Sequence, residues 1–296
     1  MEKEVLRKLK LSGQIAGRAR NFGVRLLKDG ISAFEVAQKI DDKIINLGAK
    51  PAFPTCISIN DMAAHYSPVL NDSLIIKDGD YIKLDLGAHL DGYLSDTAIT
   101  IIVGRKKDNI VECSEKMLET AIPMFKPGTK LGDIGEAIEN IAKQFGLNPV
   151  RNLTGHSIER FNLHAGRIVP NIKYQSNYEI RENEVYACEP FVTDGSGFVK
   201  ESGNHQIFRY LRENPSRMLE ARKILDLAKV EFAKLPFAKR WIQNKFSIVK
   251  VELALKELLA TDSLYGYSPL REVSGKNVAQ TEHTIIVRDK PIVTTV

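Results

Sequence analysis

The chain has 296 residues, of which 43% are hydrophobic, and a formal net charge of +5 at pH 7. This length and composition can bury a substantial core, which excludes a disordered chain and allows one large domain or two ordinary ones. The net charge is too small to argue for nucleic-acid binding, and apolar runs such as residues 98–103 are far shorter than the ~20 residues that span a bilayer.

The N-terminal segment and the cysteines indicate the compartment. The sequence MEKEVLRKLKLSG is charged and amphipathic, and it lacks the apolar stretch and small-residue cleavage site of a secretory signal. Cys56, Cys113 and Cys188 are widely spaced and form no CxxC pair, which argues against a disulfide framework or a zinc ribbon. We therefore expect a cytoplasmic protein without membrane contact, and we expect a monomer.

The predicted elements begin with helices over about the first 50 residues. Residues 32–47 give the clearest pattern, because Ser32 and Glu35 predict a capping box at its start and Gly48 predicts its end. A strand-rich block is expected to follow this helical segment.

Two alternating segments predict a pair of strands. In residues 81–86, and again in residues 96–103, apolar and polar side chains alternate, as they do in a strand with two different faces. Gly87 and Gly92 lie between the two segments, which favours a hairpin-like return.

Helices are predicted again in the middle of the chain. Residues 108–125 and 131–145 have helical periodicity, and Gly146 predicts the end of the second helix. Residues 150–199 return to a pattern of strand and loop.

The sequence pattern becomes helical between about residue 204 and residue 264. Apolar residues recur there at helical spacing, after Pro215 at a position that suits the first turn of a helix. A final strand is predicted over residues 279–287. The helical segment therefore interrupts one domain and does not follow it.

This interrupting segment is basic. Between His205 and Ser268 there are 12 Lys and Arg against 7 Asp and Glu, an excess equal to the whole net charge. A solvated helical surface explains the excess, and a contact with an anionic partner is the alternative.

Five residues stand out because each is predicted to lie on an extended segment or close to a glycine: Asp85, Asp96, His156, Glu189 and Glu282. Any one of them alone would more often be an ordinary edge or turn residue. Brought together, four carboxylates would repel strongly in a partly dry site. Two divalent ions would balance their charge, and oxygen-rich ligation with one imidazole suits manganese, cobalt, iron or zinc. A water that bridges such ions ionises near neutral pH and attacks a polarised carbonyl, so the pattern favours peptide hydrolysis.

Two further histidines, His65 in AAHYSP and His164 in NLHAG, lie close to this set in the sequence. Each could be a hydrogen-bonded structural histidine. We favour a catalytic role, in which they orient the scissile peptide and donate to its developing oxyanion or leaving amine. His89 has a weaker claim because it falls in a predicted turn, and His283 because a strand would direct it away from its neighbour Glu282.

Five segments stand in a fixed order over nearly the whole chain: PAFPTCISINDMAAHYSP, KLDLGAHLDGYLSDTAIT, NLTGHSIERFNLHAGRIVP, EVYACEPFVTDGSG and QTEHTIIV. In this combination they resemble the type II methionine aminopeptidases of archaea and eukaryotes. The two aspartates with ten residues between them, the GHSI histidine and the YACEP and TEHT glutamates match that family's five metal ligands. His65 and His164 match its two active-site histidines.

The resemblance implies an α+β pita-bread fold, in which two pseudo-symmetric halves surround an antiparallel sheet, with outer helices and two divalent metal ions at the centre. Residues 1–203 and 265–296 would form this catalytic domain. Residues 204–264 would be a helical subdomain inserted between the last two ligands, which are 93 positions apart. Such an insertion separates type II from type I enzymes.

The family's methionine pocket also carries over. It is an apolar slot with polar edges that suits an unbranched thioether. Its residues here would be Phe53, His65, Leu163, His164, Phe191, His205 and Tyr267. Cys188 departs from the family, in which an aliphatic residue is common, but this removes no ligand.

The resemblance further implies the reaction, which is removal of the initiator methionine from nascent polypeptides, with small second residues preferred. Glu189 would move the proton, while His164 and His65 would hold the carbonyl and the second residue's amide. A secondary hypothesis, which rests on the charge count alone and not on the resemblance, is that the basic segment docks the enzyme near the ribosomal exit, where RNA phosphates offer a counter-charge.

Three rival interpretations remain at this stage. Proline-specific peptidases and creatinase share the ligand pattern but usually carry a large N-terminal domain, for which the position of Asp85 leaves little room. Catalytically silent relatives that act as binding modules have lost ligands, which this chain keeps. A non-haem iron oxygenase needs two histidines and one carboxylate, and this set is too rich in carboxylates.

Overall fold

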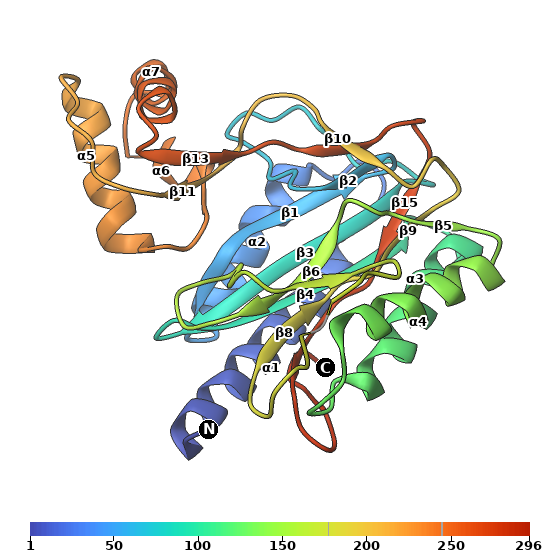
Figure 1. Ribbon diagram of the computed structural model, residues 1–296. Helices are drawn as coiled ribbons and strands as arrows, with labels where there is room; N and C mark the ends of the chain where they lie inside the picture. The colour runs from blue at the N-terminus through green and yellow to red at the C-terminus, as the bar shows by residue number, and fades with distance from the viewer. Residues whose placement is uncertain (177, 244) are drawn as a thin grey trace.

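The computed structural model describes residues 1–176, 178–243 and 245–296, and Figure 1 shows the arrangement of its helices and strands. The helices are α1 (Lys3–Leu26), α2 (Ala33–Asn46), α3 (Asn109–Ala121), α4 (Leu131–Gln144), α5 (Leu219–Leu227), α6 (Lys239–Gln243) and α7 (Ile248–Ala260). A 3-10 turn, Ile122–Met124, follows α3, and a π-helical turn, Ala228–Phe232, follows α5.

The strands range from two to ten residues. The first half contains β1 (Lys50–Ile59), β2 (Met62–Ala64), β3 (Tyr81–Leu90), β4 (Tyr93–Ile102), β5 (Asn148–Pro149), β6 (Thr154–Ile158), β7 (Ile168–Pro170), β8 (Val185–Cys188) and β9 (Phe191–Thr193). The second half contains β10 (Val199–Glu201), β11 (Ile207–Tyr210), β12 (Phe237–Ala238), β13 (Leu264–Tyr267), β14 (Leu270–Glu272), β15 (Val278–Gln280), β16 (His283–Ile286) and β17 (Ile292–Val293).

Two antiparallel sheets, each covered by a pair of helices, form the body of the molecule. One sheet has the order β1-β3-β4, and the alternating residues Ile82, Leu84 and Leu86 of β3 are buried in a core that includes α1 and α2. The other has the order β17-β16-β8-β6-β7, and its apolar face packs against α3 and α4. Figure 1 shows the two helix pairs on different sides of the strands. The expected α+β class, with outer helices around antiparallel sheet, is confirmed.

The β3–β4 hairpin is longer than the two alternating segments predict. The strands run to Leu90 and from Tyr93, and Asp91 and Gly92 form the turn with φ of 51° and 82°, as a two-residue hairpin turn requires. Gly87 was expected between the strands but lies inside β3. A Cβ there would be 2.5 Å from the ring of Phe53, so the glycine allows that ring to approach the sheet.

The helix predicted over residues 32–47 is confirmed as α2, but its capping box does not form. Ser32 makes no side-chain capping hydrogen bond, and Glu35 instead pairs with Lys39 one turn further along, at 2.6 Å. Gly48 follows the helix with φ of 88°, which explains why the helix ends there.

Residues 204–264 contain more strand than the sequence predicts. Figure 1 shows α5, α6 and α7 beside a small sheet with the order β12-β11-β13. These strands of two to four residues are too short to give a period-2 signal. The segment has a hydrophobic core of its own, formed by residues of the helices and of all three strands.

Cys56, Cys113 and Cys188 are buried and unpaired, in agreement with the expectation that they form no disulfide. Among the described residues, no helix has both the length and the apolar composition needed to cross a membrane.

Candidate metal centre

A single cavity brings together all five residues that the sequence singled out as ligands. Its lining consists of Phe53, Cys56, His65, Asp85, Asp96, His156, Leu163, His164, Glu189, Ile207, Pro236, Tyr267 and Glu282. We call it the central cavity. It lies where the two main sheets meet the segment 204–264, so its wall draws on all three parts of the structure.

Backbone register explains how the two aspartates come together. On the β3–β4 ladder Asp96 lies opposite Gly87, two residues along the strand from Asp85. Residues i and i+2 share a face of a strand, so the two carboxylates are diagonal neighbours on one face. Gly87 adds no side chain to that face, and the Phe53 ring occupies the space where a Cβ would lie.

The other three carboxylate and imidazole groups come from the second sheet. His156 lies on β6, Glu189 follows the end of β8, and Glu282 precedes β16. The Nε2 atom of His156 is 3.5 Å from Asp96 Oδ2 and 3.6 Å from Glu189 Oε1. One ligand atom each of Asp96, His156 and Glu282 lies within 4.8 Å of the others.

These distances and the unused lone pairs fit a cation. Asp85 Oδ1, Asp96 Oδ1 and Glu282 Oε1 are buried and accept no hydrogen bond among the described residues. A buried oxygen without a partner is costly, and a hard or borderline divalent ion bound by carboxylates and one imidazole removes that cost.

The raised pKa values of the carboxyl groups also favour a bound cation. Burial raises the pKa of Asp85, Glu189 and Glu282 well above the usual range, and the nearby charge of Asp96 raises all three further. Without cations the site therefore favours the protonated forms of these carboxyls, whereas a divalent ion would favour their ionised forms.

Residues that the sequence did not single out hold the ligands in place. The Gln280 amide donates to Glu189 Oε2 at 3.2 Å and to Glu282 Oε2 at 3.4 Å. The Thr97 hydroxyl donates to the Glu282 carbonyl at 2.9 Å and accepts from the buried Arg20 at 2.6 Å. Gln280 could have been found, because it lies two residues before Glu282 in an extended segment and so shares its face.

His65 and His164 lie beside the ligands. The ring centroids of His164 and His156 are 4.4 Å apart, and the His65 ring meets that of Tyr267 edge-on at 5.6 Å. Burial lowers the pKa of His65 to about 4 and the pKa of His164 well below its usual value. Both imidazoles are therefore neutral at neutral pH, and each can donate one hydrogen bond and accept another.

Some of the expected pocket residues line the central cavity and others do not. Phe53, Leu163 and Tyr267 line the central cavity, together with His65 and His164. Phe191 is buried in a neighbouring core, and His205 lies against Gly266, where a Cβ would be 2.7 Å from its ring. Neither is among the residues that line the cavity.

Three residues that were not expected complete the lining. Ile207 and Pro236 come from the segment 204–264, and Cys56 comes from β1. Ile207 is paired directly with Tyr267 on the β11–β13 ladder, which places the two side chains on one face. His205 lies two residues before Ile207, in a loop, so no sequence pattern indicated that Ile207 and not His205 would line the cavity.

The model of metallopeptidase family M24 matches residues 7–289. The chain belongs to this family. A methionine aminopeptidase from Pyrococcus abyssi is 46% identical over 290 residues, covering 97% of this chain and 98% of that protein.

Solved structures agree with this M24 assignment at the level of the fold. The structure of a thermophilic Arx1 has a TM-score of 0.87 at 16% identity, covering 99% of this chain and 91% of the other. Methionine aminopeptidase from Thermotoga maritima has a TM-score of 0.72 at 23% identity, covering 100% and 98%. The pita-bread fold and the metal-dependent peptidase class expected from the sequence are confirmed for this M24 protein.

Proposed function

We propose that this M24 metallopeptidase removes the N-terminal methionine from nascent polypeptides. One observation carries the proposal: four carboxylates, an imidazole and two neutral histidines line the same cavity as the apolar side chains of Phe53 and Leu163. Its relatives at 40–46% identity, which span nearly the whole chain, carry the name methionine aminopeptidase.

The proposed cofactor is a pair of divalent ions held by Asp85, Asp96, His156, Glu189 and Glu282. Cobalt, manganese, iron and zinc all suit this donor set. When bound, such ions polarise the scissile carbonyl and bring the pKa of a water to about 7.

The chain's own groups would position the substrate and move its protons. Glu189 Oε2 is engaged by Gln280, while Oε1 faces His156, and this carboxyl would carry a proton from water to the leaving amine. His164 and His65, neutral at neutral pH, would donate to the first carbonyl and hold the amide of the second residue.

The substrate side chain would lie against the apolar part of the wall. Phe53, Leu163, Ile207 and Tyr267 line the cavity and offer an unbranched thioether a slot without charge. Small second residues would be preferred, because the proposed ligands and histidines crowd the site beyond the first peptide bond.

The segment 204–264 is proposed to be an inserted subdomain within a catalytic domain of residues 1–203 and 265–296. Its separate hydrophobic core supports this division. We also propose that the protein acts in the cytoplasm as a monomer, and that this basic segment docks it near the ribosomal exit. Neutralising the Lys and Arg of the segment should then reduce salt-sensitive co-sedimentation with ribosomes, and unchanged binding would argue against docking.

The activity is tested by methionine release from a Met-Ala-Ser peptide. Metal-stripped protein is assayed with and without manganese or cobalt, beside Met-Pro and Ala-Pro peptides. Metal-dependent release of methionine from Met-Ala-Ser is expected. Cleavage only before proline would favour a prolidase-like enzyme, and absence of cleavage with every metal would favour a binding module.

A further inference from the structure

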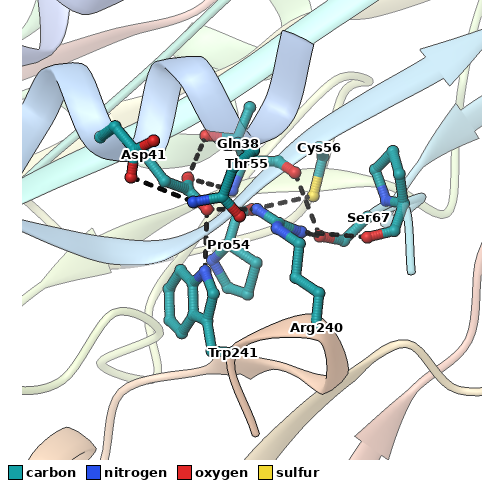
Figure 2. Close-up of polar contacts among 10 residues, drawn as sticks. Gln38, Asp41, Pro54, Thr55, Cys56, Ser67, Arg240 and Trp241 are labelled. Carbon is teal, nitrogen blue, oxygen red and sulfur yellow. Dashed lines mark hydrogen bonds and ion pairs between the residues drawn. The ribbon is translucent and has the colours of Figure 1, made fainter. Parts of the chain in front are cut away.

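A ring of four buried polar side chains lies behind the wall of the central cavity, and Figure 2 shows its members. Arg240 donates both to Asp41 and to the Ser67 hydroxyl. The Ser67 hydroxyl donates to the Thr55 carbonyl at 3.1 Å, and the Thr55 hydroxyl donates to Asp41 at 2.6 Å. All four residues are at most 2% exposed, so the ring is shielded from water.

Each member of the ring belongs to a different part of the chain. Asp41 lies on α2 and Thr55 on β1, whereas Ser67 follows β2 and Arg240 lies on α6 of the segment 204–264. The indole nitrogen of Trp241 also donates to Asp41, at 2.8 Å. Figure 2 shows Arg240 reaching up from the segment between Asp41 and Ser67. The Arg240 guanidinium therefore connects α6 with α2 and with the loop that follows β2.

Three of the four ring members lie close in the sequence to residues that line the cavity. Cys56 follows Thr55 in the sequence, His65 lies two residues before Ser67, and Pro236 lies four residues before Arg240; all three line the cavity. Asp41, by contrast, has no lining residue near it in the sequence. Neither Arg240 nor Asp41 lines the cavity itself.

Residues 65–70, which we call the His65 segment, combine an uncommon backbone conformation with several hydrogen bonds to the segment 204–264. His65 has a φ of 65°, a conformation that a residue with a Cβ adopts at a cost and keeps only where its surroundings impose it. Beyond Arg240, the segment 204–264 contributes Gln206, which accepts from the Ser67 amide at 3.0 Å, and Gln243, which accepts from the Leu70 amide at 3.2 Å.

We infer that Arg240 is a positioning residue that sets the shape of the substrate cavity. A buried ion pair gives little net stability relative to an apolar pair of similar volume, so the ring is better explained by the geometry that it imposes. Through Asp41 and Ser67, Arg240 fixes the separation between the His65 segment and the Pro236–Ile207 side of the wall. That separation determines how closely the slot fits an unbranched side chain.

This inference rests on the proposed methionine-releasing activity. Arg240→Lys keeps the charge but loses the planar fork that reaches two acceptors. Ser67→Ala removes only the hydroxyl that joins the ring to the His65 segment, and it leaves the ion pair in place. Arg288→Lys is the matched control, because Arg288 pairs with Glu182 and neither residue lines the cavity.

The experiment compares kcat/KM for Met-Ala-Ser and Leu-Ala-Ser peptides in the four metal-loaded proteins, with thermal unfolding recorded for each. We expect the Met-to-Leu ratio to fall at least tenfold in Arg240→Lys and about threefold in Ser67→Ala, with a raised KM for Met-Ala-Ser. Arg288→Lys should match the wild type. A loss of folded protein alone lowers the rates on both peptides equally, and therefore leaves both the ratio and KM unchanged.

An unchanged ratio in folded Arg240→Lys and Ser67→Ala would overturn the inference. If Arg240→Lys does not fold, Ser67→Ala decides the question alone. The wild type separates this failure from failure of the proposed function. A wild type that releases no methionine refutes the proposed function. If the wild type is active and both variants have the same Met-to-Leu ratio as the wild type, only the role of Arg240 is refuted.

Discussion

The Thr284 hydroxyl forms two hydrogen bonds with the backbone of Asp96, one as acceptor and one as donor. The Thr284 hydroxyl accepts from the Asp96 amide at 2.7 Å and donates to the Asp96 carbonyl at 2.8 Å, although the residues are 188 positions apart. Both residues are buried. One hydroxyl thus fixes a proposed metal ligand of β4 against β16, at the junction of the two main sheets.

Thr284→Val should therefore weaken metal binding as well as folding. The substitution keeps the shape but leaves a buried amide and a buried carbonyl without their partner, at a cost of roughly 2 kcal/mol in the free energy of unfolding. Groups that orient a metal ligand typically change metal affinity by about 10–100-fold. Calorimetric titration with manganese and urea unfolding would measure the two effects. Thr284→Ser, which retains the hydroxyl, should resemble the wild type in both.

Removal of the Asp96 carboxylate should abolish turnover. Asp96 would hold the proposed ions together with His156 and Glu282, whose ligand atoms lie within 4.8 Å of one of its own, so Asp96→Ala would remove a carboxylate from the middle of the proposed ligand set. We expect methionine release to fall by more than about 10³-fold, an effect on the scale of a lost catalytic metal. The control is Asp133→Ala, which removes an exposed carboxylate in the first turn of α4. A fully active Asp96→Ala protein would refute the assignment of the centre.

His164→Ala should reduce kcat while leaving the bound metal in place. His164 packs against His156 and is proposed to donate to the carbonyl under attack, a contribution of about 10²–10³-fold. Metal content measured on the purified variant should equal that of the wild type. Loss of metal in proportion to activity would mean instead that His164 supports a ligand. His89→Gln, outside the cavity lining, provides the comparison.

The sequence singled out the five proposed ligands, which lie in one cavity, but it did not single out several residues of the cavity wall. Asp85 and Asp96 follow from local alternation and a hairpin, and Glu282 lies in a recognisable motif. Ile207 and Pro236 could not be found in this way, because their place depends on how the segment 204–264 packs. Arg240 is one of 42 Lys and Arg residues, and its partner Asp41 is 199 positions away. Nothing in the local pattern distinguishes it.

Glu272 provides a pH test that is independent of the metal. Burial opposes ionisation of this carboxyl, but hydrogen bonds from the Ser196 and Ser274 hydroxyls and from the Lys276 and Ser196 amides lower its pKa to about 2. The Ser274 amide and hydroxyl each approach the carboxylate to 2.6 Å. These contacts tie β14 to the loops that flank it.

The sign of the effect follows from the lowered pKa. An unfolded glutamate has a pKa of about 4.3, so the stabilisation by ionised Glu272 is complete above that pH and is lost as the pH falls toward 2. Glu272→Gln should cost about 3 kcal/mol at pH 7 and less than half of that at pH 3, as measured by urea unfolding of both proteins at each pH. A difference that stays constant between pH 7 and pH 3 would contradict the lowered pKa. It would mean that the amide simply packs less well than the carboxylate.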